Sequence, residues 1–479
     1  MIRPVRQLTR AATLVFAIAL PAAAQAPAID YDKLREETAQ RLSEYIRINT
    51  SNPPGNELAT ARWLKEVLAK EGIEGQILDT AELGPGRANF YARLKGTGRG
   101  KAIALVHHMD VVPVSREFWS VDPFAGQIKD GYLWGRGALD MKGHGIVQLM
   151  TLIAIKRAGI PLTRDLVYIG NADEESGGSG SRALIARHPE LIGDVEYLLT
   201  ESGGSRVENG KVRWYGMNVG EKRVYWQKLV VKGKASHGSR PTPYNPVPRL
   251  ARILTRIAAW ETPLRVTPAV DRYLKAQAKA ETGEHRRWLA DVTAALKSTD
   301  GRAWLVSEPE RNALLRNTIS PTVLVGSNKT NVIPPQASAE LDIRLLPDQD
   351  TLAFRRELLR VIADTGVTLT TIADMAPQFS APLDTEMSRA IQRTAARFLP
   401  GVPFATTVST GATDRPYYAG AGLICYGIDP FLVDVEDARR GVHGNDERVS
   451  VENLGFGLRL YAGVLEEMQG WRKSVNGEQ

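Results

Sequence analysis

Residues 102–113 read Ala-Ile-Ala-Leu-Val-His-His-Met-Asp-Val-Val-Pro, a short apolar run followed at once by polar side chains. An unbroken apolar run of this length is typical of a strand buried on both faces, as in a parallel sheet. Similar runs recur at 166–169, 197–199 and 423–426. Because helical patterns separate several of these runs, for example at 145–158, the order of elements predicts an α/β domain.

The pattern changes between residues 222 and 375. Strand patterns at 224–231, 322–325, 337–344 and 367–372 alternate with helical patterns at 247–257 and 351–362. The resulting order, β-α-β-β-α-β, is the ferredoxin-like arrangement. It carries an extra helical, charge-rich segment at about 265–312. Because the α/β pattern resumes after residue 376, we expect an α/β domain of residues 25–221 and 376–479, with an α+β domain of residues 222–375 inserted into it.

The length and the N-terminus set the broad class of protein. A chain of 479 residues with 43% hydrophobic and 24% charged residues is of ordinary globular composition and long enough for two domains. Three arginines within residues 1–10, the apolar stretch 11–20 and three alanines at 22–24 form a secretory signal pattern. We therefore expect residues 1–24 to be a signal peptide and the protein to be periplasmic or secreted. The alternative is that this segment stays as a membrane anchor.

Charge and cysteine content exclude several classes of function. Removal of residues 1–24 takes away three arginines and no acidic residue, so the net charge falls from +7 to +4. That charge, without a basic run or an aromatic ladder, argues against a nucleic-acid partner. No later segment suggests membrane association. The single cysteine, Cys425, cannot form an internal disulfide and is expected to be a small buried hydrophobic residue.

Polar residues that could carry chemistry follow the predicted buried strands. Ligands of open α/β sheets bind beyond the carboxyl ends of the strands, so these side chains are expected to meet at one edge. Two histidines and several carboxylates suit zinc or a similar metal. The candidate residues are His108 and Asp110 in 106–113, Asp140 in 135–143, Glu174 and Glu175 in 171–178, Glu201 in 198–203, and His443 in 441–444.

The first of these segments holds two adjacent histidines. In an extended chain His108 and Asp110 point to the same side, and a carboxylate there could orient a metal-bound imidazole. This spacing favours His108 as the ligand. Three roles stay open for His107: an alternative metal ligand, a packed residue of the strand, or a hydrogen-bond donor to one of the metal ligands.

The motifs HxDVVP, GRGxxDMKG, DEExGG and a late HG make the chain resemble the M20 metallopeptidase family over nearly its whole length. The resemblance implies a di-zinc exopeptidase-like fold with a mixed, mainly parallel sheet and an inserted lid or dimerisation domain. It implies two divalent metal ions, zinc with cobalt or manganese as alternatives. Asp140 would bridge them, His108 and Glu201 would complete one site, and Glu175 and His443 the other. Asp110 would orient His108, and Glu174 would be the general base.

The same resemblance implies roles for the inserted domain. His237 would polarise the scissile carbonyl, often across a dimer interface, which makes a homodimer through the lid an expectation. Asn331 and Arg344 would bind a free substrate carboxylate, and Gly411 belongs to a glycine-rich loop that would line the pocket. The extra segment resembles the carboxypeptidase S-like branch. It could enlarge an acyl pocket, or it could serve stability or dimerisation.

The roles of two pairs of residues near the C-terminus stay open. Asp414 and Arg415 follow the glycine-rich loop, and they could pair only with each other. The acid expected after the late histidine is displaced by one residue, so the roles of Asp446 and Glu447 stay open.

The sequence thus predicts a metal-dependent hydrolase that cuts an amide or peptide bond in an N-acyl amino acid or small peptide with a free carboxylate. The glutamate at position 201 resembles the acylase and carboxypeptidase members of the family. The alternatives are an aminopeptidase-like di- or tripeptidase and a non-catalytic binding homologue.

Overall fold

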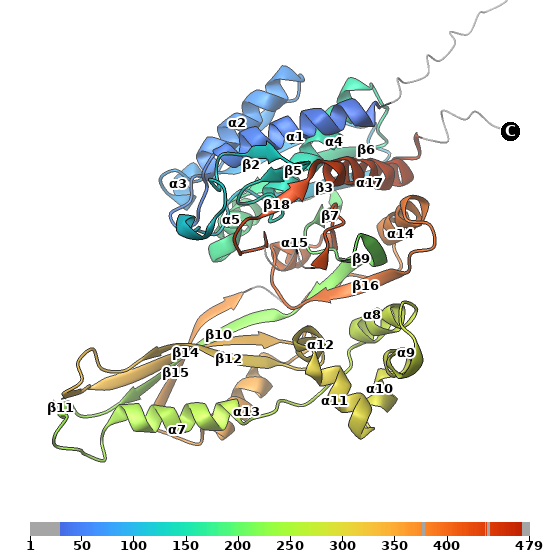
Figure 1. The fold of residues 1–479 in the computed structure, drawn as a ribbon. Helices are drawn as coiled ribbons and strands as arrows, with labels where there is room; N and C mark the ends of the chain where they lie inside the picture. Colours follow the sequence, from blue (N-terminus) through green and yellow to red (C-terminus); the bar gives the residue numbers. More distant parts are fainter. Residues whose placement is uncertain (1–28, 376–378, 436, 438–440, 472–479) are drawn as a thin grey trace, which may run out of the picture.

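The computed structural model describes residues 29–375, 379–435, 437 and 441–471. The predicted signal peptide lies outside these residues, as does residue 376, the predicted start of the second part of the α/β domain. The described residues form four sheets, and the two largest, each with its own helices, occupy opposite ends of the molecule (Figure 1). Among the described helices, none is both long and apolar enough to cross a membrane.

The larger sheet has nine strands in the order β1-β2-β6-β3-β7-β17-β9-β16, with β8 paired to β9. The neighbours β6, β3, β7 and β17 run parallel, whereas β1, β2 and β8 pair antiparallel. The sheet is therefore mixed, and the predicted α/β fold is confirmed. Its strands are β1 (Gly75–Leu78), β2 (Asn89–Leu94), β3 (Gly100–His108), β6 (Arg164–Asn171), β7 (Val195–Thr200), β8 (Ser205–Glu208), β9 (Lys211–Glu221), β16 (Phe404–Ser409) and β17 (Ile424–Ile428).

Helices cover this sheet and bury its apolar strands. Three of them, α1, α4 and α17, pack against one another, and α4 also contacts β3 and β6. The run 102–106 in β3 is completely buried, as its composition predicts, and Cys425 in β17 is buried as well. The helices are α1 (Tyr31–Arg47), α2 (Glu57–Lys70), α3 (Thr80–Leu83), α4 (Lys142–Arg157), α5 (Ser179–Arg187), α6 (Pro189–Ile192), α14 (Glu386–Phe398), α15 (Arg415–Gly420) and α17 (Val451–Gln469).

The smaller sheet has the order β12-β14-β10-β15, with all neighbours antiparallel. Along the chain the elements run β10 (Arg223–Lys232), α7 (Pro246–Ala258), β12 (Thr318–Val325), β14 (Gln336–Leu345), α13 (Thr351–Ile362) and β15 (Val367–Met375). This is the predicted β-α-β-β-α-β order. A short ladder of β11 (Ser236–His237) and β13 (Val332–Ile333) lies at the end farthest from the larger sheet (Figure 1).

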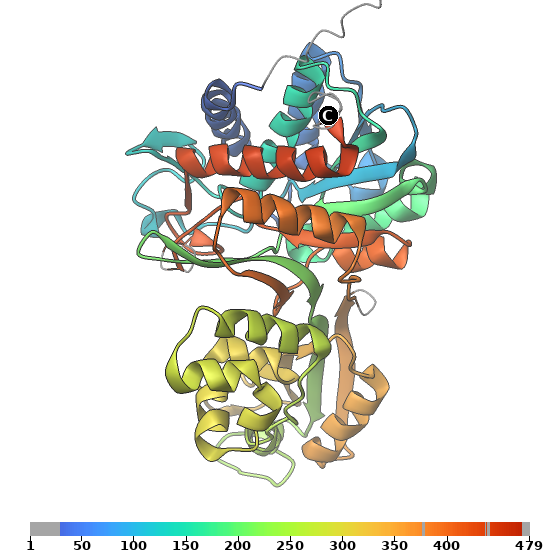
Figure 2. The same ribbon diagram turned by 90° about the vertical axis from the view of Figure 1, so that its right-hand side faces the viewer.

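The extra segment forms five short helices between α7 and β12. They are α8 (Pro268–Ala278), α9 (Gly283–Ala290), α10 (Val292–Ala295), α11 (Thr299–Ser307) and α12 (Pro309–Leu314). Helix α8 packs on β16 and β9 of the larger sheet (Figure 2). Trp214, Ala405 and Val408 of those strands share one apolar cluster with the segment. The segment therefore packs onto the larger sheet, although it lies in sequence within the inserted region.

Candidate metal centre

Two groups of side chains in the described residues could each hold a metal ion. One consists of His108, Asp140 and Glu201, and the other of Asp140, Glu175 and His443. Asp140 belongs to both groups. Its Oδ1 lies 3.1 Å from His108 Nε2, and its Oδ2 lies 3.1 Å from His443 Nε2. A carboxylate with one oxygen toward each histidine has the geometry of a bridge between two cations.

The remaining two acids complete the groups. Glu201 Oε2 lies 3.9 Å from His108 Nε2, and Glu175 Oε2 lies 3.2 Å from His443 Nε2. All five residues predicted as metal ligands are therefore brought together. Their origin explains this: β3 ends at His108, Glu201 directly follows β7, and Glu175 follows β6 within the 3-10 turn η2 (Glu174–Ser176). These three strands are parallel neighbours, so their carboxyl ends meet at one edge of the sheet.

The donor set fits divalent cations. The Oε1 atom of Glu175 is buried and has no hydrogen-bond partner among the described residues. Burial, reinforced by the neighbouring acids, raises the pKa of Glu174 and of Glu201 well above the usual range. Grouped buried carboxylates are costly unless a positive charge neutralises them. Imidazole and carboxylate groups are ligands that zinc accepts in proteins, and they also suit similar divalent metals.

The structure distinguishes the two adjacent histidines. His107 points away from the cluster: its Nε2 lies 3.0 Å from Tyr45 Oη and its Nδ1 lies 3.1 Å from the carbonyl of Ile169. Burial lowers the pKa of His107 to about 3. Since successive side chains of a strand face opposite sides, His108 alone of the pair reaches the acids.

Asp110 acts differently from the expectation that its side chain orients His108. The main-chain carbonyl of Asp110 accepts the hydrogen bond from His108 Nδ1 at 2.9 Å, so the proton resides on Nδ1 and a neutral ring would turn the Nε2 lone pair toward Asp140. The carboxylate lies farther away, with Oδ1 3.7 Å from Nδ1. It accepts the main-chain N–H groups of Glu174 and Glu175, each at 3.2 Å. The buried Asp110 side chain therefore holds the turn that presents those two acids.

Two residues without a sequence-based role support this arrangement. Asn52 Nδ2 donates to the Asp110 carboxylate at 2.7 Å and to Asp173 at 2.9 Å. Glu447, whose role the displaced motif left open, is completely buried. Its carboxylate accepts the N–H groups of Gly137, Leu139 and Asp140 and pairs with Arg136 at 2.7 Å. Asp446 instead binds Ser120, through both its N–H and its hydroxyl.

Asp414 and Arg415 do not pair with each other. Asp414 accepts hydrogen bonds from Asn171 Nδ2 and Ser181 Oγ, each at 2.7 Å. Arg415 is completely buried and forms an ion pair with Glu221 at 2.9 Å. The prediction that Asp414 and Arg415 pair only with each other is therefore wrong. The reason is that Asp414 faces the end of β6 and the start of α5, whereas Arg415 faces the end of β9.

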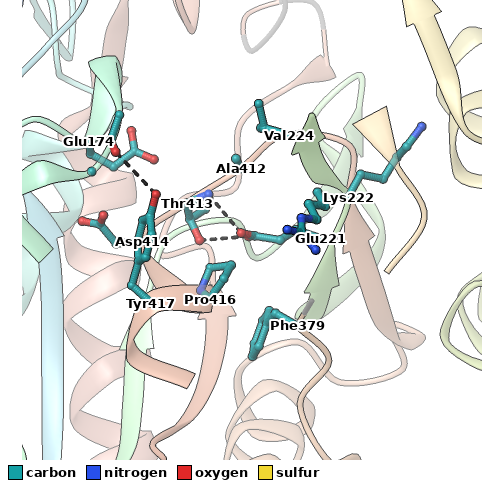
Figure 3. Close-up of a pocket in the computed structure, with 13 residues that line it drawn as sticks. Glu174, Glu221, Lys222, Val224, Phe379, Ala412, Thr413, Asp414, Pro416 and Tyr417 are labelled. Carbon is teal, nitrogen blue, oxygen red and sulfur yellow. Dashed lines mark hydrogen bonds between the residues drawn. The ribbon is translucent and has the colours of Figure 1, made fainter. Parts of the chain in front are cut away.

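A pocket lies beside Glu174. Its other walls are the loop 412–414 with Tyr417, and residues 221–224 with Phe379 (Figure 3). Residues 221–224 join β9 to β10, so the pocket lies where the two sheets connect. Gly411 is exposed at the end of the same loop, and its N–H donates to Ser409 Oγ at 3.0 Å.

The three residues predicted in the smaller sheet do not join the cluster. His237 is exposed, with Nδ1 2.7 Å from Ser239 Oγ, and the carbonyl of Asn331 accepts the N–H of Gly238 at 2.7 Å. His237 belongs to β11 and Asn331 directly precedes β13, so both lie at the short ladder of these two strands. Arg344 pairs with Asp342 at 2.7 Å and lies over the ring of Trp226. In the described part of the chain, no recorded hydrogen bond or ion pair joins these residues to the metal-capable groups.

Comparisons with known proteins identify the family of the chain. The model of peptidase family M20/M25/M40 matches residues 104–467. N-fatty-acyl-amino acid synthase/hydrolase of Xenopus tropicalis is 28% identical over 381 residues, which cover 76% of this chain and 71% of the relative. Aminoacylase-1 of Sus scrofa is 25% identical, covering 89% and 93%. Among solved structures, an M20 family metallo-carboxypeptidase from Sulfolobus solfataricus superposes with a TM-score of 0.69 at 17% identity, covering 90% of this chain and 98% of that one. The chain belongs to peptidase family M20/M25/M40 and is an enzyme of the metallopeptidase and amidohydrolase type.

Proposed function

We propose that this enzyme hydrolyses the amide bond of an N-acyl amino acid or small peptide with a free carboxylate, using two divalent metal ions and Glu174 as the general base. The observation that carries the proposal is the placement of Asp140 between His108 and His443, with one oxygen 3.1 Å from each ring. Bound divalent ions would supply Lewis acidity and lower the pKa of a shared water molecule. Zinc is the first choice, and cobalt or manganese are alternatives.

Glu174 suits the role of the base by position. It precedes the candidate ligand Glu175 and also lines the pocket of Figure 3. In hydrolysis, the water oxygen bonds to the carbonyl carbon, the C–N bond breaks, and the proton taken from water passes to the leaving nitrogen. A carboxylate that lines the pocket next to a candidate ligand can carry that proton. The pocket beside Glu174 would then hold the amino acid that leaves.

The smaller sheet would serve as a lid. His237, Asn331 and Arg344 would reach a substrate only through a movement of this sheet or from a second copy of the chain. Strand β12 offers a surface for such a copy, because it is an edge strand whose Val323, Leu324 and Val325 are exposed. Exposed apolar edge strands readily pair with another chain. A homodimer is therefore part of the proposal. Export to the periplasm or the medium is also part of it, on the basis of the signal pattern in residues 1–24.

Hydrolysis assays would test the proposal. Metal-free protein would be reloaded with zinc, cobalt or manganese and offered N-acetyl amino acids, blocked dipeptides and free dipeptides. Turnover of the blocked substrates that returns with metal is the expected result. Turnover of free dipeptides alone would favour the aminopeptidase-like alternative. A metal content well below one ion per chain after reloading would contradict the two-metal site.

A further inference from the structure

A buried ion pair lies behind the turn that carries Glu174 and Glu175. Arg87, in the loop before β2, donates to both carboxylate oxygens of Glu57, with Nη2 2.7 Å from Oε1 and Nε 3.2 Å from Oε2. The side chain of Glu57 is completely buried, and that of Arg87 is 14% exposed. The same Nη2 atom donates to Asp173 Oδ1 at 3.0 Å. Among the described residues, Arg87 is the only cation that forms an ion pair with either acid. We call Glu57, Arg87 and Asp173 the arginine bridge.

Asp173 has a backbone conformation that residues other than glycine rarely adopt. Its φ is +65°, in the left-handed region. Its carboxylate is held by Arg87, by Asn52 Nδ2 at 2.9 Å, and by both the N–H and the hydroxyl of Ser179. Its own N–H donates to Glu57 Oε1 at 3.4 Å. Because η2 begins at the next residue, the conformation of Asp173 sets the direction in which that turn leaves β6.

The arginine bridge is joined to the other support of the same turn. Asn52 Nδ2, which donates to Asp173, also donates to the carboxylate of Asp110 at 2.7 Å. Asp110 accepts the main-chain N–H groups of the first two residues of η2, each at 3.2 Å. Two carboxylates that share one amide repel each other, and Arg87 supplies a positive charge that offsets this repulsion. The turn is therefore held at its start by Asp173 and at its main-chain N–H groups by Asp110.

We propose that Arg87 is a positioning residue for the metal centre: through Asp173 it fixes the turn that presents Glu175 to a metal ion and Glu174 to the scissile bond. This inference rests on the proposed function, which gives those two acids their roles. The histidine and the glutamate of the other metal-capable group come from β3 and from the end of β7, outside this turn. Loss of Arg87 should therefore weaken one metal site more than the other.

The test compares Arg87→Met with Arg93→Met in full-length protein reloaded with zinc. Arg93 on β2 is the matched control, because its side chain is 13% exposed and also pairs with two acids, Asp165 and Asp194. Within the described residues, none of its recorded contacts reaches η2. Both replacements should lower thermal stability. Only Arg87→Met should weaken the binding of one of two zinc ions per chain in chelator competition, by about 10- to 100-fold, the usual loss when a group behind a metal ligand is removed. Its kcat should fall by about the same factor, since the base is displaced.

The double replacement Glu57→Gln/Arg87→Met separates positioning from folding. Loss of Arg87 alone leaves Glu57 buried without a cation, which can prevent folding. The double variant has no charge at residue 57, so its thermal stability should recover. Asp173 still lacks its cation in that variant, so zinc affinity and kcat should stay low. Recovery of both to the level of Arg93→Met would show that the pair serves only the fold, and it would overturn the inference.

The outcomes also separate this inference from the proposed function. If the unmodified protein binds well below one zinc ion per chain after reloading, both are overturned. If it binds two ions but hydrolyses no acyl amino acid or peptide, the proposed function is overturned, and the zinc affinities of the variants still decide the role of Arg87 at the metal centre. If it is active and Arg87→Met keeps the zinc affinity and kcat of Arg93→Met, the inference alone is overturned.

Discussion

The carboxylate of Glu447 accepts the main-chain N–H of Asp140 at 3.0 Å, although the two residues lie 307 positions apart. The same carboxylate holds two further N–H groups of that loop and the guanidinium of Arg136. Asp140 can therefore face both histidines only while the C-terminal segment is in place.

Replacement Glu447→Gln should weaken metal binding. It removes the negative charge that contacts both the loop and Arg136. Loss of a group that supports a metal ligand typically reduces the affinity for the metal about 10- to 100-fold. Chelator competition with zinc would measure the affinity. Glu452→Gln, at an exposed glutamate, is the matched control and should bind zinc as the unmodified protein does. Equal affinities for the two variants would contradict the role assigned to Glu447.

Removal of metal should abolish turnover and lower thermal stability. The clustered acids Asp140, Glu175 and Glu201 lose their neutralising charge when the ions leave, and a ligand that binds only the folded state stabilises it. Elemental analysis of the reloaded protein should give two ions per chain, and His108→Ala should reduce that content. An apo protein as stable and as active as the loaded one would disprove the metal centre.

Replacement Glu174→Gln should reduce kcat by about 10²- to 10⁴-fold while two metal ions stay bound, because only the proton acceptor is lost. Steady-state kinetics combined with metal analysis would check this. Glu190→Gln, at an exposed glutamate, serves as the control. Undiminished turnover of Glu174→Gln would exclude the residue as the base.

Protonation of His107 should destabilise the fold as the pH decreases from about 6.5 toward 3. His107 is buried and neutral, since burial lowers its pKa to about 3, whereas in the unfolded chain it binds a proton near its ordinary value of 6.5. Between these values the unfolded state holds the extra proton, so each pH unit removes about 1.4 kcal/mol of stability per such group. Denaturant unfolding of apo protein at pH 7 and 5 would measure the loss, and His107→Gln should reduce it. A loss of the same size in the variant would show that other groups dominate.

The oligomeric state can be tested at the edge of the smaller sheet. The side chain of Leu324 on β12 is 69% exposed, so Leu324→Asp should prevent pairing with a second copy and give a monomer in light scattering. Leu352→Asp on α13, at a comparably exposed leucine, should leave the assembly unchanged. A monomeric unmodified protein would refute the proposed homodimer.

Local patterns in the sequence predict the α/β order, the β-α-β-β-α-β unit and the cluster of acids and histidines after the buried strands. These features follow from local patterns. Apolar runs such as 102–106 identify strands buried on both faces, and polar residues directly after parallel strands must meet at one sheet edge.

The folded structure was needed for features that depend on contacts between distant segments. It placed His107 against Tyr45 and Ile169, anchored the Asp140 loop on Glu447, separated Asp414 from Arg415, and packed α8 onto β16. It also placed His237 and Asn331 at the distal ladder rather than at the metal centre. Periodicity in a sequence reports which face of an element is apolar, but it does not report which remote carboxylate, ring or helix that face will meet.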